Sequence, residues 1–188
     1  DPAFMALVRE TAERKVELVA NYLREVVWPH LEGNPSAKVI VFGHHRVMLD
    51  RIQNETERAE LRNSSKDGAK AQKIGFIRID GKTDKQTRQP LVDQFQTDQS
   101  VRVAVLSIKA AGTGLTLTKA NIVIMSELLF GPNDMFQAED RSHRIGQEKN
   151  VFIRYLMLKG TTDDVLWKMI QAKTRNVGRV LDNRAEHI

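Results

Sequence analysis

Short, largely apolar runs recur along the chain, and they constrain its fold more than any other feature. The runs are residues 39–42, 76–79, 101–106, 122–125 and 151–158, each containing valine or isoleucine. Apolar runs of about four to eight residues are typical of strands buried on both faces of a parallel sheet. Helical or polar segments separate the runs, so we predict an α/β fold with an open, mainly parallel sheet and helices on both faces.

Amphipathic patterns predict the first helices of this fold. Apolar residues recur every three or four positions over residues 5–28, and we expect Pro29 and residues 33–35 to end that helix. A second helix is expected over residues 47–61. Residues 63–73 are polar and contain Gly68, two serines and three lysines. This composition predicts a flexible loop, longer than most connections in a compact domain.

Two more helices are expected later in the chain. Pro90 conflicts with a helix interior, so we expect a helix over residues 88–96 with Pro90 in its first turn. The residues that this helix would bury are Leu91, Val92 and Phe95. The final helix is expected over residues 161–181, where Thr162, Asp163 and Asp164 would form the cap and first turn. Its inward-facing residues are expected to be Val165, Leu166, Met169 and Ile170.

Length and composition favour one globular domain. The chain has 188 residues, of which 41% are hydrophobic and 28% charged, enough for an adequate core. Residues 1–4 precede Met5, so we interpret them as a vector remnant and residues 5–188 as a single domain. The formal net charge is +5 and the sequence pI is about 9.6, a balance that fits contact with nucleic acid but does not prove it.

Several classes of protein are disfavoured by the same counts. The sequence has no cysteine, which excludes disulfide bonds and thiolate metal sites. No apolar run approaches the roughly 18 residues that span a membrane, so no membrane partner is expected. His44 and His45 are adjacent and therefore diverge, and we do not expect them to bind a metal. No Gly-x-Ser-x-Gly turn is present, so a hydrolase built on that motif is not expected.

Ligands of open parallel sheets bind at the carboxyl ends of the strands, so the loops after the strands are the candidate binding sites. Residues 107–114 follow one strand and contain alanines and glycines, which would let a phosphate backbone approach closely. The side chains that could donate hydrogen bonds there are Ser107, Lys109 and Thr113. The alternative is an ordinary strand-to-helix turn that needs positive φ, and local sequence does not decide between the two.

A polar stretch over residues 137–147 lies between the last two apolar runs. We expect it to form a helix that Asn133 caps, with Asp134 in the first turn and Gly146 at the stop. The side chains that would share one face, at i, i+4 and i+7, are Gln137, Arg141 and Arg144. Two guanidiniums suit a polyanion. A solvated face is the alternative, because the pairs Asp140–Arg144 and Glu139–His143 have i,i+4 spacing.

Gly81-Lys82-Thr83 imitates the end of a nucleotide-binding P-loop but lacks its context. The motif requires a glycine five residues before Gly81, where this chain has Phe76. The residues that should form the loop are the predicted strand over residues 76–79. An independent nucleotide kinase or NTPase built on this segment is therefore disfavoured. Trp167 lies in the last helix, where we expect it to pack rather than to stack on a base.

The string QAEDRSHRIGQ at residues 137–147 resembles motif VI of the Swi/Snf family of ATP-driven DNA translocases, in superfamily two of the helicases. Residues 107–121 resemble motif V of that family, and residues 39–45 resemble motif IV. The double histidine is most similar to the annealing-helicase, fork-remodelling subgroup. Residues 77–95 resemble the conserved block that borders the DNA track. The resemblance spans roughly residues 39–181 and implies the second RecA-like lobe, the helicase C-terminal domain.

The resemblance also implies roles for individual residues. The arginine fingers that would reach the γ-phosphate of ATP are Arg141 and Arg144. The residues that would couple the nucleotide to closure of the site are Gln137, Gly112 and Gly114. The residues that would hold the DNA backbone are Ser107, Lys109, Thr113, Lys82 and Arg88. No metal ligand is expected in this chain.

The partners implied are the DNA backbone and the first RecA-like lobe of the same protein. ATP with Mg²⁺ would be bound mainly by that first lobe, whose P-loop and acidic motif are absent from this sequence. The isolated chain is therefore predicted to be inactive, although the full-length protein would be an ATP hydrolase. A nuclear location is expected if the source is eukaryotic. The alternative interpretation is a non-catalytic module that docks DNA or protein.

Overall fold

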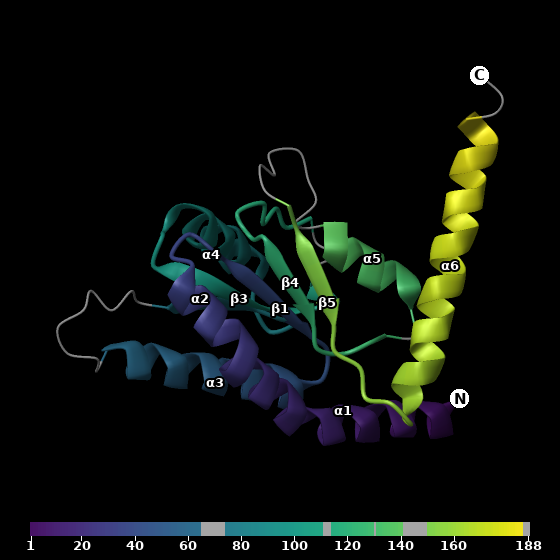
Figure 1. The fold of residues 1–188 in the computed structure, drawn as a ribbon, viewed down its shortest axis with the longest axis horizontal. Helices are drawn as coiled ribbons and strands as arrows, with labels where there is room; N and C mark the ends of the chain where they lie inside the picture. Colours follow the sequence, from purple (N-terminus) through teal and green to yellow (C-terminus); the bar gives the residue numbers. More distant parts are fainter. Residues whose placement is uncertain (65–73, 111–113, 130, 141–149, 186–188) are drawn as a thin grey trace.

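The computed structural model is organised around one five-stranded sheet (Figure 1). It describes residues 1–64, 74–110, 114–129, 131–140 and 150–185. The strands are β1 Val39–Gly43, β2 Gly75–Ile79, β3 Val101–Ser107, β4 Ile122–Met125 and β5 Phe152–Tyr155. Their order across the sheet is β2-β3-β1-β4-β5, and every pair is parallel. The predicted α/β class and mainly parallel sheet are confirmed.

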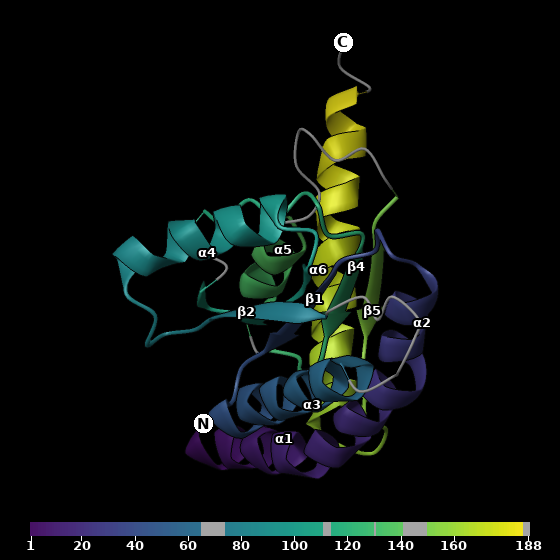
Figure 2. The ribbon, with the colours of Figure 1, turned by 90° about the vertical axis from the view of Figure 1, so that its left-hand side faces the viewer.

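Helices cover both faces of the sheet, which gives three layers (Figure 2). The helices on one face are α1 Pro2–Tyr22, the π-helical turn η1 Leu23–Val27, α2 Trp28–Gly33 and α3 Arg46–Ser64. The helices on the other face are α4 Lys85–Thr97, α5 Pro132–Asp140 and α6 Thr162–Ala185. The C-terminal part of α6 extends beyond the sheet in both views.

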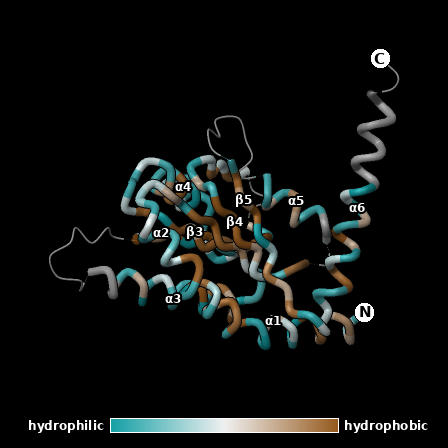
Figure 3. The backbone as a smooth tube through the Cα atoms, viewed as in Figure 1, coloured by the Kyte–Doolittle hydropathy of each residue, from teal (hydrophilic) through white to brown (hydrophobic). Residues whose placement is uncertain are grey.

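The alternation of side chains along β1 explains the two cores. Val39 and Val41 are buried against α1 to α3, whereas Ile40 and Phe42 are buried against the opposite helices. Because successive strand residues point to opposite faces, a strand covered on both sides must be apolar at every position. The hydropathy of the chain shows this directly, with the most hydrophobic segments at the centre of the molecule (Figure 3).

The first helix differs from the prediction at both ends. Residues 1–4, interpreted as a vector remnant, continue the helix, and the Asp1 carboxylate accepts a hydrogen bond from the amide of Ala3 at 2.8 Å. Pro29 does not end the helical segment, which continues to Gly33. Proline lacks an N–H donor, and the wide η1 turn directly before it accommodates that loss. Trp28 and Leu31 are fully buried and keep the continued helix on the sheet.

Helix α4 begins earlier than predicted, and Pro90 lies inside it rather than in its first turn. Asp84 is the N-cap residue, and its carboxylate accepts a hydrogen bond from the amide of Thr87 at 2.9 Å. This cap starts the helix one turn before Arg88. Pro90 is exposed to solvent, where water can satisfy the carbonyl that the proline leaves unpaired. Val92 and Phe95 are buried as predicted, and Leu91 is half-buried.

The last strand is shorter and more exposed than its sequence suggested. β5 pairs only with β4, and Phe152 is 59% exposed. An edge strand has one neighbour, so apolar composition alone does not bury it. In α6, Leu166 and Ile170 are buried as predicted and Met169 is partly buried, but Val165 is 49% exposed. Trp167 packs against Tyr155 with ring centroids 4.9 Å apart, which confirms its packing role.

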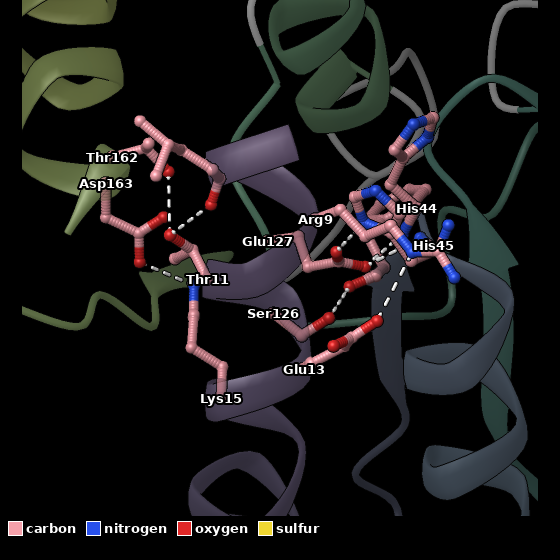
Figure 4. Close-up of polar contacts among 12 residues, drawn as sticks. Arg9, Thr11, Glu13, Lys15, His44, His45, Ser126, Glu127, Thr162 and Asp163 are labelled. Carbon is pink, nitrogen blue, oxygen red and sulfur yellow. Dashed lines mark hydrogen bonds and ion pairs between the residues drawn. The ribbon is translucent and has the colours of Figure 1, made fainter. Parts of the chain in front are cut away.

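The start of α6 is fastened to α1 by buried polar contacts (Figure 4). Lys15 Nζ lies 2.8 Å from Asp163 Oδ2, and both side chains are almost inaccessible to solvent. Thr162 Oγ1 donates to Thr11 Oγ1 at 2.9 Å. Asp163 and Asp164 lie in the first turn of α6 as predicted, but the partner of Asp163 on α1 was not anticipated. Within the described residues, no helix is both long and apolar enough to cross a membrane.

Candidate nucleic-acid interface

A cleft of about 510 Å³ opens at the carboxyl ends of β1, β2 and β3. The residues that line it are His44, Arg46, Leu49, Asp50, Arg78, Asp80, Gly81, Lys82, Ser107 and Lys109. Three side chains predicted to contact DNA, Lys82, Ser107 and Lys109, therefore come together from two different loops. Parallel pairing brings them to one edge, because Ile79 and Leu106 lie opposite each other at the strand ends.

The turn between β2 and α4 is held by a network around Asp80. The Arg78 guanidinium contacts Asp80 at 2.9 Å and Asp50 at 2.8 Å, and the amide of Lys82 donates to Asp80 at 2.8 Å. Partial burial acts to raise the pKa of Asp80, but the Lys82 amide and the Arg78 guanidinium outweigh burial and hold it below its ordinary value. The carboxylate therefore stays ionised and keeps the backbone of Gly81 and Lys82 in the cleft wall.

Lys82 and Arg88 occupy different environments in this region. Lys82 is exposed and lines the cleft. Arg88 is half-buried, and its guanidinium donates to the carbonyl of Thr83 at 3.0 Å and to that of Asp80 at 3.3 Å. Arg88 does not line the cleft. Its hydrogen bonds to the two carbonyls instead stabilise the turn that carries Lys82.

The same turn accounts for Gly81-Lys82-Thr83. β2 occupies the residues that a P-loop would need, which confirms the strand predicted there. The amide of Asp80 donates to the Thr83 hydroxyl at 3.0 Å, so this hydroxyl takes part in the turn. The geometry of the segment is that of an ordinary strand-to-helix turn.

The loop after β3 exposes the cationic side chain of Lys109 between two buried residues. Ile108 and Ala110 are buried, and Lys109 between them is exposed. The amide of Ile108 donates to the carbonyl of Gly43 at 2.9 Å, which ties this loop to the end of β1. Gly114 has φ of +86°, so the turn does need a residue free of the Cβ penalty. Gly112 and Thr113 lie outside the described residues.

The loop after β1 is held by a carboxylate that sequence reasoning missed. Glu127 Oε2 accepts hydrogen bonds from the amides of His44 at 2.5 Å and His45 at 3.0 Å, and Glu127 Oε1 lies 2.5 Å from His45 Nδ1. Burial and then His45 lower the pKa of His44, Glu127 opposes them less strongly, and Lys109 and Asp134 have still smaller effects in opposite directions. No three His, Asp or Glu side chains within the described ranges are arranged to bind a metal.

Helix α5 leads from the sheet toward the remaining predicted residues. It begins at Pro132, so Asn133 is inside the helix rather than its cap, and the Asn133 side chain accepts a hydrogen bond from Lys173 of α6. Asp134 lies in the first turn as predicted, and Gln137 is exposed. Burial, with help from the charge of Asp140, raises the pKa of Glu139 to about 7.

Arg141 and Arg144 lie outside the described residues. So do the expected stop at Gly146 and the His143 partner of Glu139. The shared face of Gln137 with the two arginines and the alternative ion pairs therefore both stay predictions.

Comparison with known proteins agrees with this architecture. Residues 15–146 match the family described as the helicase conserved C-terminal domain. The chain belongs to this family. It is 48% identical over 146 residues to a Caenorhabditis elegans homolog of SWI/SNF-related matrix-associated actin-dependent regulator of chromatin subfamily A-like protein 1, a match covering 78% of this chain and 19% of that protein. It is 41% identical over 182 residues to the human DNA annealing helicase and endonuclease ZRANB3, covering 97% of this chain and 15% of that protein.

A solved structure supports the fold. The crystal structure of the C-terminal part of the Fun30 ATPase domain matches with a TM-score of 0.66 and 29% identity, covering 83% of this chain and 44% of that one. The helicase C-terminal domain and the RecA-like α/β fold are thus confirmed, as is the resemblance to Swi/Snf-related annealing helicases. The chain spans less than a fifth of the length of the two relatives described above.

Proposed function

We propose that this chain is the second motor lobe of a DNA-dependent ATPase that translocates on DNA and remodels DNA or protein–DNA complexes. The observation that carries the proposal is the cleft at the ends of β1, β2 and β3, where Lys82, Ser107 and Lys109 converge. Cations and small polar donors in one groove suit a chain of phosphates. Membership of the helicase C-terminal family, with an annealing helicase among the relatives, supports this assignment.

The charges of the cleft favour phosphate over a neutral ligand. Arg46 and Arg78 pair with Asp50, and Arg78 also pairs with Asp80. Lys82 and Lys109 form no ion pair with a carboxylate of the described residues, so their charges are available to a ligand. We expect these contacts to be independent of the DNA sequence, because they would be made to phosphates and not to base edges.

The nucleotide would bind in a second place, between this lobe and the first. In this proposal Arg141 and Arg144 reach the γ-phosphate as arginine fingers, where they would stabilise charge developing in the transition state. Gln137, Gly112 and Gly114 would couple the nucleotide to closure of the lobes. ATP with Mg²⁺ would be held mainly by the first lobe, so the isolated chain should not hydrolyse ATP. A eukaryotic source would place the full-length protein in the nucleus with DNA.

Titration of a labelled DNA duplex at several salt concentrations tests the cleft. Roughly three to five neutralised phosphates predict a log–log salt slope of about −3 to −4.5. Lys82→Ala and Lys109→Ala should each make the slope shallower by about 0.9, because each removes one phosphate contact. Lys119→Ala is the matched control, since Lys119 is exposed but lies just before β4, at the amino ends of the strands, whereas the cleft lies at their carboxyl ends.

Three results would count against the proposal. A salt slope near zero would show that binding neutralises no phosphates. A strong preference among unrelated duplex sequences would show that base edges are read instead. Equal losses for Lys119→Ala and Lys109→Ala would mean that general positive charge, rather than the cleft, attracts the duplex.

A further inference from the structure

Glu127 is a charged residue in a place where charge is costly. It follows β4, is 3% exposed, and does not line the cleft. A buried carboxylate destabilises the fold unless hydrogen-bond donors surround it. Here both oxygens are used, because Oε2 accepts from two amides and Oε1 contacts the His45 ring. All of its partners in these contacts lie in the connection between β1 and α3, more than 80 residues away along the chain.

The neighbouring contacts make this connection rigid. The amide and hydroxyl of Ser126 both donate to the carbonyl of Phe42, the amide at 3.0 Å. His45 directly precedes α3, and its carbonyl accepts from the amides of Met48 at 3.0 Å and Leu49 at 3.1 Å. Glu127 therefore also lies at the N-terminus of a 19-residue helix, where the helix dipole favours a negative charge. Figure 4 shows the carboxylate facing both histidines.

The consequence of this arrangement is the position of His44. Its amide is fixed by Glu127, and its ring meets the His45 ring edge-on with centroids 4.8 Å apart. The His44 side chain is half-buried and lines the cleft. We propose that His44 binds a DNA phosphate and that Glu127 is a positioning residue, which acts through the His44-His45 pair without touching DNA. This inference rests on the proposed DNA cleft.

The charge state of His44 supplies a readout that a purely structural role would not change. Burial and then the nearby His45 lower its pKa, Glu127 opposes them less strongly, and Lys109 (lowering) and Asp134 (raising) contribute still less. At pH 7.5 the ring is neutral and can donate one hydrogen bond but brings no charge. Because the pKa is lowered, protonation needs a pH below the ordinary range of histidine; it would add a cation to the cleft, which should steepen the salt slope toward one further contact, by up to about 0.9.

The variants Glu127→Gln, His44→Ala and their double mutant test the inference by duplex binding at pH 7.5. Gln keeps the size of the side chain but puts an NH₂ group where a carboxylate oxygen faced a donor. We expect each single variant to weaken binding about fivefold, the effect of one ordinary hydrogen bond. The double mutant should bind no more weakly than His44→Ala, because both changes remove the same contact.

Asp163→Asn is the matched control for stability. Asp163 is another buried carboxylate, paired with Lys15, and it does not line the cleft. It should lower the melting temperature but leave duplex affinity within twofold at a temperature where the chain is folded. His44→Ala provides a second arm if Glu127→Gln does not fold, because its ring is half-buried and its loss leaves Glu127 with its other donors.

The outcomes separate the inference from the function on which it rests. Unchanged binding by folded Glu127→Gln, additive losses in the double mutant, or an equal loss in Asp163→Asn would each overturn the role of Glu127. A salt slope that steepens equally between pH 7.5 and pH 5.5 in the unmodified chain and in His44→Ala would overturn the role of His44. If Lys109→Ala weakens duplex binding but Glu127→Gln and His44→Ala bind normally, the proposed DNA cleft is supported and the roles of His44 and Glu127 are overturned. No duplex binding by the unmodified chain would overturn cleft and inference together.

Discussion

Replacing one member of the buried Lys15–Asp163 pair should destabilise the fold strongly. The ammonium of Lys15 lies 2.8 Å from Asp163 and also donates to the carbonyl of Leu156 at 2.6 Å. Asp163 also accepts from the amide of Leu158 at 2.8 Å. Lys15→Met keeps most of the volume of the side chain but removes the ammonium from the buried Asp163 carboxylate, which keeps its hydrogen bond from the Leu158 amide. The pair joins α1 to α6 across opposite ends of the chain, so the whole fold responds to its loss.

The magnitude follows from the burial of both charges. Breaking a buried ion pair from one side costs about 3–5 kcal/mol, because the remaining charge is uncompensated, whereas an exposed pair contributes about 0–1 kcal/mol. The side chains of Lys15 and Asp163 are 3% and 4% exposed, so the cost expected for a buried ion pair applies. For a domain of this size, about 3–5 kcal/mol lowers the melting temperature by roughly 6–20 °C. The exposed pair Arg9–Glu13 gives the control, and Arg9→Met should change the melting temperature by less than about 4 °C.

Urea denaturation followed by circular dichroism measures this effect. The single variants Lys15→Met and Asp163→Leu should each lose about 3–5 kcal/mol, while the double mutant should recover much of the loss because no uncompensated charge is left. The two changes are therefore expected to be strongly non-additive. Additive losses, or a Lys15→Met variant as stable as Arg9→Met, would refute the reasoning that the pair is buried and mutually compensating.

Three further predictions concern other parts of the chain. Glu139 has its pKa raised to about 7 from an ordinary value of 4.5, so its contribution to stability should fall as pH rises between those values. Glu139→Gln should remove that dependence and add about 1 kcal/mol at pH 8, after allowing for its partial exposure, and urea denaturation at pH 5 and 8 checks this. In the two-lobed protein, Arg144→Ala should reduce DNA-stimulated ATP turnover by about 10³–10⁵ and Arg144→Lys should restore little, whereas a turnover within twofold of the parent would end the arginine-finger assignment. Replacement of residues 63–73 by a short Gly/Ser linker should leave the melting temperature nearly unchanged, since that segment has no apolar periodicity, and a large fall would show that it packs into the core.

Local chemistry made several features of the chain predictable. β-branched apolar runs indicated the strands, because such residues fit a pleated surface that is covered on both faces. Asp163 and Asp164 marked the first turn of α6, where the helix dipole favours carboxylates. The start of α4 was predicted wrongly at Arg88, because Pro90 was placed in the first turn, whereas Asp84 is the N-cap residue. That error shows that an exposed helix can retain a proline at the cost of one backbone hydrogen bond.

Other features depended on neighbours that are distant in the sequence. The apolar run of β5 could not reveal that Phe152 is exposed, because its burial depends on whether another strand covers the edge. Glu127 gave no local signal, since its hydrogen-bond partners lie 82 and 83 residues away. Nothing near Lys15 in the sequence indicates that it is buried and paired with Asp163 of α6.

The sequence by itself therefore determined the strands, most of the helices, the family resemblance and the cations of the cleft. It did so because periodicity, capping and motif spacing are properties of short segments. Only the tertiary structure decided the strand order β2-β3-β1-β4-β5, which brings Lys82, Ser107 and Lys109 to one cleft. It also decided which charges are buried and paired. Those outcomes depend on contacts between segments far apart in the chain, where burial sets the energy of a charge and no local pattern records its partner.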